Sequence, residues 1–391
     1  MKPTFQNHLA QTTPFPFGIK VDRAEGAYIY DQEGKKYLDL ISGISVSALG
    51  HGHPRIKAAL KKQIDRHLHV MVYGEFIQDA QNELAEELLK TLPQSLNDFY
   101  FLNSGAEANE AALKLAKRAS GRTEIIAYHG AYHGSTHGAL SVSSNESRKA
   151  AFRPLLPEIR FIELNKTEEL SQITEQTAAV ILETIQGDAG VRIPKKSYLQ
   201  ALRKRCDATK TLLILDEIQC GMGRSGKFWA FEHFDIVPDI LTAGKALGAG
   251  MPMGCLVASQ NLMKLFSHDP MLGHITTFGG HPLCCAAAAE GLRIMEDEKL
   301  PEKVDQKAEL IISLLKHPEI KTIRQIGLLI AVELENESKV KKVVLSGLEK
   351  GILLFWFLST PHAFRIAPPY IISEDEIREG CALLIKCLDE L

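Results

Sequence analysis

Short apolar runs alternate with longer amphipathic stretches along most of the chain. Short runs that are apolar on both faces suit the buried strands of a parallel sheet. We therefore predict strands at residues 99–102, 124–128, 179–182, 212–215, 236–241, 328–334 and 352–357.

Helical periodicity and helix-end signals predict the helices between these runs. The last helix begins after Ser373, and Glu376 completes a capping box with it. Residues 26–43 read as a β-hairpin around an Asp-Gln-Glu-Gly turn. One further helix is expected to begin near Pro54. Three others are expected at residues 79–92, which end before Pro93, at 107–120, which end before a Gly121 cap, and at 301–316.

Composition and charge argue against several classes of protein. The 391 residues are 45% hydrophobic and 24% charged with a net charge of −3, so nothing favours a nucleic-acid-binding or polybasic membrane surface. No apolar run approaches the roughly 20 residues of a membrane helix, and the N-terminus lacks a signal-peptide core. The seven cysteines form no CxxC pair and no zinc-type cluster, so we expect no metal site and a reducing, cytoplasmic location.

The most informative stretch covers residues 211–250, where charged side chains follow two predicted strands. Asp216 stands at the end of the first, and ligand groups in α/β sheets lie beyond the carboxyl ends of strands. Lys245 follows the second, as a single cation among small and apolar residues. A lysine removed from water has a lowered pKa and becomes a Schiff-base-forming amine. A lysine that simply reaches solvent is the alternative.

These two residues belong to segments that resemble the core signature of the class III pyridoxal-phosphate (PLP) aminotransferases, namely LLILDEIQCGMGRSG and DILTAGKALGAGMPMG. The resemblance extends over nearly the whole chain. It implies that Lys245 forms the Schiff base with PLP and that Asp216 keeps the pyridine nitrogen protonated.

The resemblance also implies an α/β architecture of PLP fold type I. We expect a large domain with a mostly parallel seven-stranded sheet, and a small α/β domain built from both termini. The expected divisions are residues 1–48, which join the small domain, 49–291, the large PLP-binding domain, and 292–391, the small C-terminal domain.

A turn of small residues before the helix at 107–120 offers free backbone N–H groups at the positive end of the helix dipole. Such a turn suits a phosphate, although taken alone it could be an ordinary strand–turn–helix connection. The resemblance implies that Ser104, Gly105 and Ala106 form the cup for the PLP phosphate.

Further cofactor contacts follow from the resemblance. Tyr132, followed by His133, fits the position whose aromatic ring stacks on the cofactor, and Gln219 fits the hydrogen bond to its phenolic oxygen. Thr277 corresponds to a threonine that donates to the cofactor phosphate of the neighbouring subunit. This implies a homodimer with shared active sites, whereas a threonine that satisfies its own turn is the alternative.

The chain departs from the family pattern at Ser135. Acetylornithine and ornithine aminotransferases typically carry an arginine there, which binds a substrate carboxylate through a bidentate pair. Glu183 corresponds to a glutamate that in several subfamilies pairs with a C-terminal arginine, here Arg365, when no α-carboxylate is bound. A static pair or two unrelated charges is the alternative. With Thr276, these residues are the candidates for binding the substrate.

Two other patterns, one typical of a dinucleotide-binding dehydrogenase and one of a metal site, are not supported by their surroundings in the sequence. The segment 221–226 matches the dinucleotide pattern G-x-G-x-x-G, but it does not follow its strand directly and opens no helix. His51 and His53 lack a third metal ligand nearby.

We therefore predict a PLP-dependent aminotransferase that moves an amino group from a terminal-amine or amino-acid donor to a 2-oxo acid by a ping-pong mechanism. It resembles the acetylornithine/ornithine group. Ser135 favours the alternative, an ω-amino acid or amine transaminase that uses pyruvate, or a diaminopelargonate-type enzyme. An aminomutase and a non-catalytic PLP-fold binding protein stay open as further alternatives.

Overall fold

A seven-stranded sheet forms the centre of the larger part of the molecule, in a computed structural model that describes residues 3–391. Its order is β4-β10-β9-β8-β7-β5-β6, and all neighbours are parallel except β10, which is antiparallel to β4 and β9. The mostly parallel seven-stranded sheet is therefore confirmed. Its strands are β4 (Asp98–Leu102), β5 (Glu124–Tyr128), β6 (Ile159–Ile162), β7 (Thr177–Glu183), β8 (Leu212–Asp216), β9 (Ile240–Gly244) and β10 (Gly254–Ala258).

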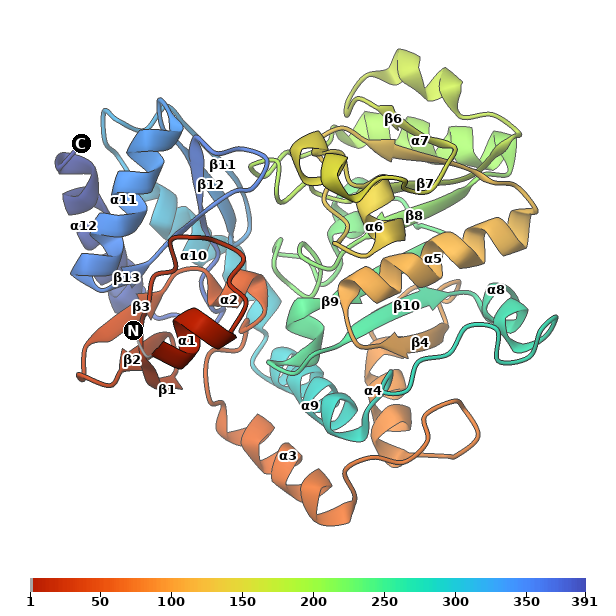
Figure 1. Ribbon diagram of the computed structural model, residues 1–391, viewed down its shortest axis with the longest axis horizontal. Coiled ribbons are helices and arrows are strands. Elements are labelled where there is room, and N and C mark those ends of the chain that lie inside the picture. The colour runs from red at the N-terminus through yellow and green to blue at the C-terminus, as the bar shows by residue number, and fades with distance from the viewer. Residues whose placement is uncertain (1–2) are drawn as a thin grey trace.

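Helices flank this sheet and build much of the smaller part of the molecule (Figure 1). The predicted helices are confirmed to within a few residues, including the capping box, in which Glu376 N donates to Ser373 Oγ and Ser373 N to Glu376 Oε2. The α-helices are α1 (Pro3–His8), α2 (Ser42–Ser45), α3 (Pro54–Arg66), α4 (Asp79–Leu89), α5 (Gly105–Ser120), α6 (His137–Val142), α7 (Lys196–Thr209), α8 (Gln260–Met263), α9 (Pro282–Asp297), α10 (Leu300–Leu314), α11 (Glu337–Lys350) and α12 (Glu374–Asp389).

Side chains of the central strands enter two separate cores, because successive residues of a strand point to opposite faces. Ile181 and Ile214 pack into the core that contains the apolar face of α5. Their neighbours Leu182 and Leu215 join the core that contains α7 and α9. Burial on both faces explains why these strands are apolar throughout instead of alternating.

Two four-stranded sheets form the smaller part. Because β13 pairs in parallel with β3, segments from both ends of the chain share one sheet, and Figure 1 shows both termini on this side. The predicted hairpin is the antiparallel pair of β2 and β3. The sheets contain β1 (Val21–Glu25), β2 (Tyr28–Asp31), β3 (Lys36–Asp39) and β13 (Ile352–Leu353), and β11 (Thr322–Ile326), β12 (Leu329–Glu333), β15 (Ala363–Ile366) and β14 (Phe355–Trp356).

Two predicted strands have the wrong limits. The strand expected at 236–241 is β9, which begins only at Ile240. Pro238 has no N–H for a ladder, and the Asp239 carboxylate instead accepts the backbone N–H of Leu213 at 2.7 Å. The strand expected at 352–357 is divided into β13 and β14, which belong to different sheets.

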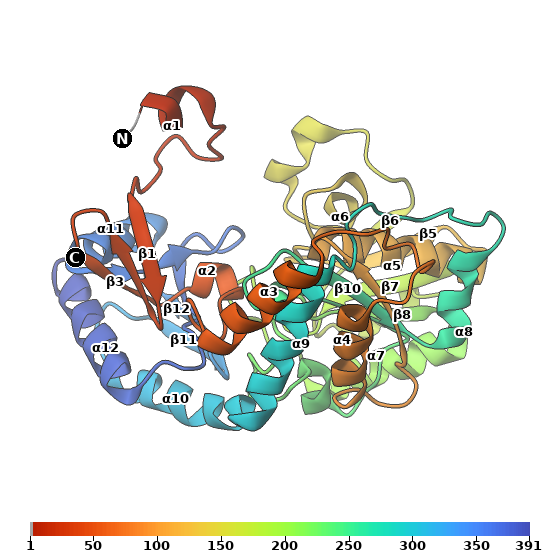
Figure 2. The same cartoon turned by 90° about the horizontal axis from the view of Figure 1, so that it is seen from below.

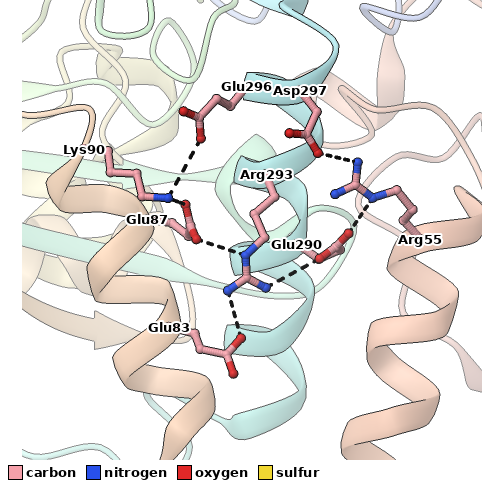
Figure 3. A network of polar contacts seen from close by, with 8 residues as sticks. All are labelled: Arg55, Glu83, Glu87, Lys90, Glu290, Arg293, Glu296 and Asp297. Carbon is pink, nitrogen blue, oxygen red and sulfur yellow. Dashed lines mark hydrogen bonds and ion pairs between the residues drawn. The ribbon is translucent and has the colours of Figure 1, made fainter.

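Three helices, α3, α4 and α9, pack side by side next to the central sheet (Figure 2). A chain of ion pairs joins them, and Figure 3 shows how Arg293 on α9 lies at its centre. Arg293 contacts Glu83, Glu87 and Glu290 at 2.9, 3.0 and 3.6 Å. Within residues 3–391, no helix is long and apolar enough to cross a membrane.

Candidate active site

A cavity of about 320 Å³ opens beyond the carboxyl ends of β7 and β8. Glu183 and Asp216, the last residues of these two strands, lie on its wall. Lys245 lines the same cavity, directly after the end of β9. The two residues singled out by the sequence, Asp216 and Lys245, thus face one space, as ligand groups at strand ends do in open α/β sheets.

Hydrogen bonds hold the Asp216 carboxylate in one orientation. Its Oδ2 accepts from Asn109 Nδ2 at 2.8 Å and from His133 Nδ1 at 2.7 Å. Its Oδ1 accepts the backbone N–H of Ile218 at 3.0 Å. Because an ionised carboxylate only accepts, Nδ1 of His133 carries a hydrogen in this arrangement.

Lys245 begins a short 3-10 helix (Lys245–Gly248) and has a left-handed backbone, with φ of 47°. The residue is partly buried, and desolvation lowers the pKa of its amine while the Asp216 carboxylate opposes that shift. A lowered pKa increases the fraction of neutral amine at neutral pH, which a nucleophile or proton acceptor requires.

The N-terminus of α5 forms another part of the wall. Ser104 is the N-cap, and its Oγ accepts from Glu107 N at 3.2 Å. Gly105 and Ala106 reach the cavity, whereas Ser104 is occupied with capping the helix. A Cβ on Gly105 would lie 2.6 Å from Ile218 Cδ1, so only glycine lets the helix start approach this closely. The free N–H groups of such a start favour an anion.

Two further predicted cofactor residues face the cavity. Tyr132 is 36% exposed, and its hydroxyl lies 3.4 Å from the Ser135 hydroxyl. Gln219 has a buried Nε2 without a hydrogen-bond partner within the described chain. A buried amide nitrogen in that state is a donor that a ligand oxygen can satisfy.

Glu183 is held by two backbone donors rather than by an arginine. Its carboxylate accepts from Tyr132 N at 3.0 Å and from Gly187 N at 2.9 Å. Burial, together with the neighbouring Asp216 charge and against the pull of His133, raises the pKa of Glu183 to about 7.

The predicted pair of Glu183 with Arg365 is wrong. Arg365 is buried beside Asp188, with Nη2 3.4 Å from Asp188 Oδ1, and its guanidinium carbon lies 4.5 Å from the ring centre of Phe357. The loop after Glu183 brings Asp188 closer to this arginine. Arg365 keeps a buried Nε without a partner among residues 3–391.

Thr276 and Thr277 lie away from this cavity in the single chain. Thr276 Oγ1 accepts from Asn103 Nδ2 at 2.8 Å and lines a larger groove of about 660 Å³. Thr277 is exposed. Ser135 is also exposed, at the rim of the smaller cavity.

Three buried residues of the site were missed by the sequence analysis, namely Asn109, Asp188 and Thr242. Asn109 and Thr242 are polar residues at positions where the helix and strand patterns are otherwise apolar. That interruption was the available signal. Asp188 carried no such signal, because it stands in a loop of small residues.

Known proteins resemble this chain over almost its full length. The family model described as Aminotransferase class-III matches residues 10–388. The acetylornithine aminotransferase of Methanopyrus kandleri is 38% identical, over 97% of this chain and 96% of that protein. A LysW-aminoadipate semialdehyde/glutamate semialdehyde transaminase of Sulfolobus acidocaldarius is 37% identical, over 94% of each. The ornithine aminotransferase structure of Toxoplasma gondii, with PLP in partial occupancy, matches with a TM-score of 0.91, 31% identity and coverage of 99% and 92%.

Proposed function

This chain belongs to the class-III aminotransferases, and from that premise we propose which of its residues carry out amino transfer and on what class of substrate. The enzyme is PLP-dependent, as this family is. When bound, the cofactor supplies an electron sink for the charge left as the substrate carbon loses a proton.

The cavity has hydrogen-bond donors and a volume that suit PLP. Gln219 Nε2 is an unsatisfied donor at its wall, and the start of α5 at Gly105 and Ala106 suits the phosphate. Its volume of about 320 Å³ suits a small ligand. We assign Tyr132 to stacking on the face of the cofactor ring. We assign Thr277 to a hydrogen bond with the phosphate of the cofactor bound in a partner subunit.

We assign the proton transfer to Lys245. We assign to Asp216 the contact that keeps the cofactor's pyridine nitrogen protonated. The Lys245 Nζ, whose pKa is lowered by burial, would take a proton from the substrate carbon and pass it to the cofactor, which is the net proton movement that amino transfer requires. The single observation that carries this assignment is that both side chains face one cavity.

Arg365 is our candidate for the substrate carboxylate. Its Asp188 contact is long at 3.4 Å, and its Nε has no partner in the described chain. Asp188 keeps two other donors, Leu358 N and Ser359 Oγ, so it stays satisfied when Arg365 turns to a substrate. Glu183 and Thr276 remain weaker candidates, since neither contacts Arg365.

We propose a terminal-amine donor of the acetylornithine or ornithine type and a 2-oxo acid acceptor, in a ping-pong sequence. The names of the relatives in Methanopyrus, Sulfolobus and Toxoplasma support this class. Ser135 supports the second candidate, an ω-amino acid or amine transaminase that uses pyruvate. Among residues 3–391, Lys245 is the only lysine or arginine that lines the cavity, and Arg365 lies outside that lining, so a second substrate carboxylate has no cationic partner at the cavity wall.

A homodimer with shared sites is the assembly we propose. Exposed apolar side chains lie close to Thr277 in the sequence, namely Met271, Ile275 and Phe278, at 78%, 46% and 55%, and the first two line the groove of about 660 Å³. Such a patch is typical of a subunit contact.

We also propose that the domains divide after residues 48 and 291. A cytoplasmic location is a further proposal, and the seven free cysteines support it.

A screen of half-reactions tests the substrate class. Ornithine, N-acetylornithine, lysine, β-alanine, simple amines and glutamate are each added to the purified holoenzyme, and the change in cofactor absorbance is followed. Ser135→Arg is measured beside the native enzyme and should increase the response to glutamate. An unchanged glutamate response in that variant would refute our interpretation of Ser135.

Lys245→Ala is expected to abolish turnover, because no other amine of the described residues lines the cavity. Losing a general acid–base group costs about 10²–10⁴-fold, and losing the covalent anchor costs more. Steady-state kinetics with the best donor from the screen measures the loss. Normal turnover in this variant would end the assignment.

A further inference from the structure

One buried amide, the side chain of Asn109, contacts both the Asp216 carboxylate and the backbone of His133, which also donates to that carboxylate. Asn109 on α5 is fully buried, and its Nδ2 donates both to Asp216 Oδ2 and to the backbone oxygen of His133, each at 2.8 Å. His133 in turn donates its Nδ1 hydrogen to the same Oδ2 at 2.7 Å. Asn109 therefore holds the Asp216 carboxylate directly. It also holds the backbone of His133, whose side chain is the other donor to that carboxylate.

The orientation of this amide is determined by its neighbours. Both groups at Nδ2 are acceptors only, so the NH₂ end must face them. The opposite end, Asn109 Oδ1, accepts from Thr242 Oγ1 at 2.8 Å. Thr242 is fully buried on β9 and pairs with Asp216 across β8 and β9. Its hydroxyl hydrogen is the donor that favours this amide orientation over the flipped one.

We infer that Asn109 and Thr242 are positioning residues that aim the Asp216 carboxylate at the cofactor ring nitrogen. The inference rests on the proposed role of Asp216. Oδ2 accepts from the two side-chain donors, while Oδ1 accepts from a single backbone N–H within residues 3–391 and keeps an acceptor position for a ligand. A carboxylate held in this way offers Oδ1 to a ring N–H without reorganising, which is what a preorganised site requires.

Thr242→Val removes the hydroxyl donor and keeps the shape of the side chain. Asn109 Oδ1 then loses its partner, and the amide is no longer held toward Asp216. Thr242→Ser keeps the hydroxyl and should behave like the native protein. Thr211→Val is the matched control, because Thr211 is also a buried threonine, but its hydroxyl contacts Thr209 far from the site.

The decisive measurement compares two cofactors. Each apoprotein is titrated with PLP and with 1-deaza-PLP, in which C–H replaces the ring nitrogen. Thr242→Val should weaken binding of PLP about tenfold, because the Asn109 amide is then held less firmly against the Asp216 carboxylate, and leave binding of the deaza analogue unchanged. Asn109→Ala should show the same selectivity with a larger loss. Thr242→Ser and Thr211→Val should show neither effect.

The inference is overturned if Thr242→Val weakens both cofactors equally or neither. Should Asn109→Ala not fold, the Thr242→Val and Thr242→Ser pair still decides. Asp216→Asn separates this result from the proposed function. If Asp216→Asn weakens binding of PLP and not of the deaza analogue, while Thr242→Val shows no such selectivity, the positioning roles of Asn109 and Thr242 fail and the role of Asp216 stands. If Asp216→Asn weakens both cofactors equally, the assignment of Asp216 to the ring nitrogen fails with them.

Discussion

Gly105 stands where the start of α5 meets the Ile218 side chain. A Cβ there would come within 2.6 Å of Ile218 Cδ1 and 2.9 Å of Cγ2, so Gly105→Ala must displace a residue of the cavity wall. We expect affinity for PLP to fall about tenfold, since overpacking typically costs more than about 1 kcal/mol. Titration of the apoprotein with PLP measures this. Gly248→Ala is the control, because its Cβ would meet Met253 at an ordinary 3.4 Å. Equal losses in both variants would contradict the prediction.

Glu183 is a buried carboxyl whose pKa is raised, mainly by desolvation, from 4.5 to about 7. Between these pH values the unfolded chain releases the proton while the folded chain retains it. The free energy of unfolding should therefore fall as pH rises through this window, by about 3 kcal/mol in total. Glu183→Gln cannot titrate, so its unfolding free energy should depend less on pH. Denaturant unfolding of both proteins across the window measures the two slopes, and identical slopes would refute the raised pKa.

At the scale of elements, the ion pairs among α3, α4 and α9 connect segments that are far apart in sequence (Figure 3). Arg293 on α9 contacts Glu83 and Glu87 on α4, and Glu87 is buried. Arg293→Met removes these contacts and leaves Glu87 with Lys90 as its remaining partner. We expect a loss of about 1–2 kcal/mol, which is more than an isolated surface pair provides.

Thermal unfolding at low and high salt checks this prediction. The loss should shrink as salt screens the network. Arg23→Met is the matched control, because the Arg23–Glu25 pair is exposed, at 54% and 76%. A pair of that kind contributes about 0–1 kcal/mol. If Arg293→Met costs no more than Arg23→Met, the network does not stabilise the packing of these helices.

At the scale of the whole molecule, the dimer proposal can be tested by mixing inactive subunits. Lys245→Ala removes the amine of its own site, and Thr277→Ala is proposed to damage the site of its partner. A heterodimer of the two variants then contains one intact site. Random exchange of subunits should restore about a quarter of native activity. No recovery after verified exchange would mean that Thr277 serves its own subunit or no site.

Local sequence determined most of the secondary structure. The strand β5 and the capping box at Ser373 were predicted correctly, because periodicity and end signals depend on residues within a few positions of each other. Asp216 and Lys245 were singled out for a related reason, since Asp216 ends one recognisable buried strand and Lys245 follows another. Their meeting in one cavity follows from the adjacent, parallel β8 and β9.

Tertiary structure alone decided which distant groups meet. Arg365 pairs with Asp188 and not with Glu183, because the loop after β7 carries Asp188 toward β15 while backbone N–H groups already satisfy Glu183. The division of residues 352–357 between two sheets depended on β3, more than 300 positions earlier. Such choices depend on long-range geometry and on competition for buried partners, and neither is encoded in the pattern of neighbouring residues.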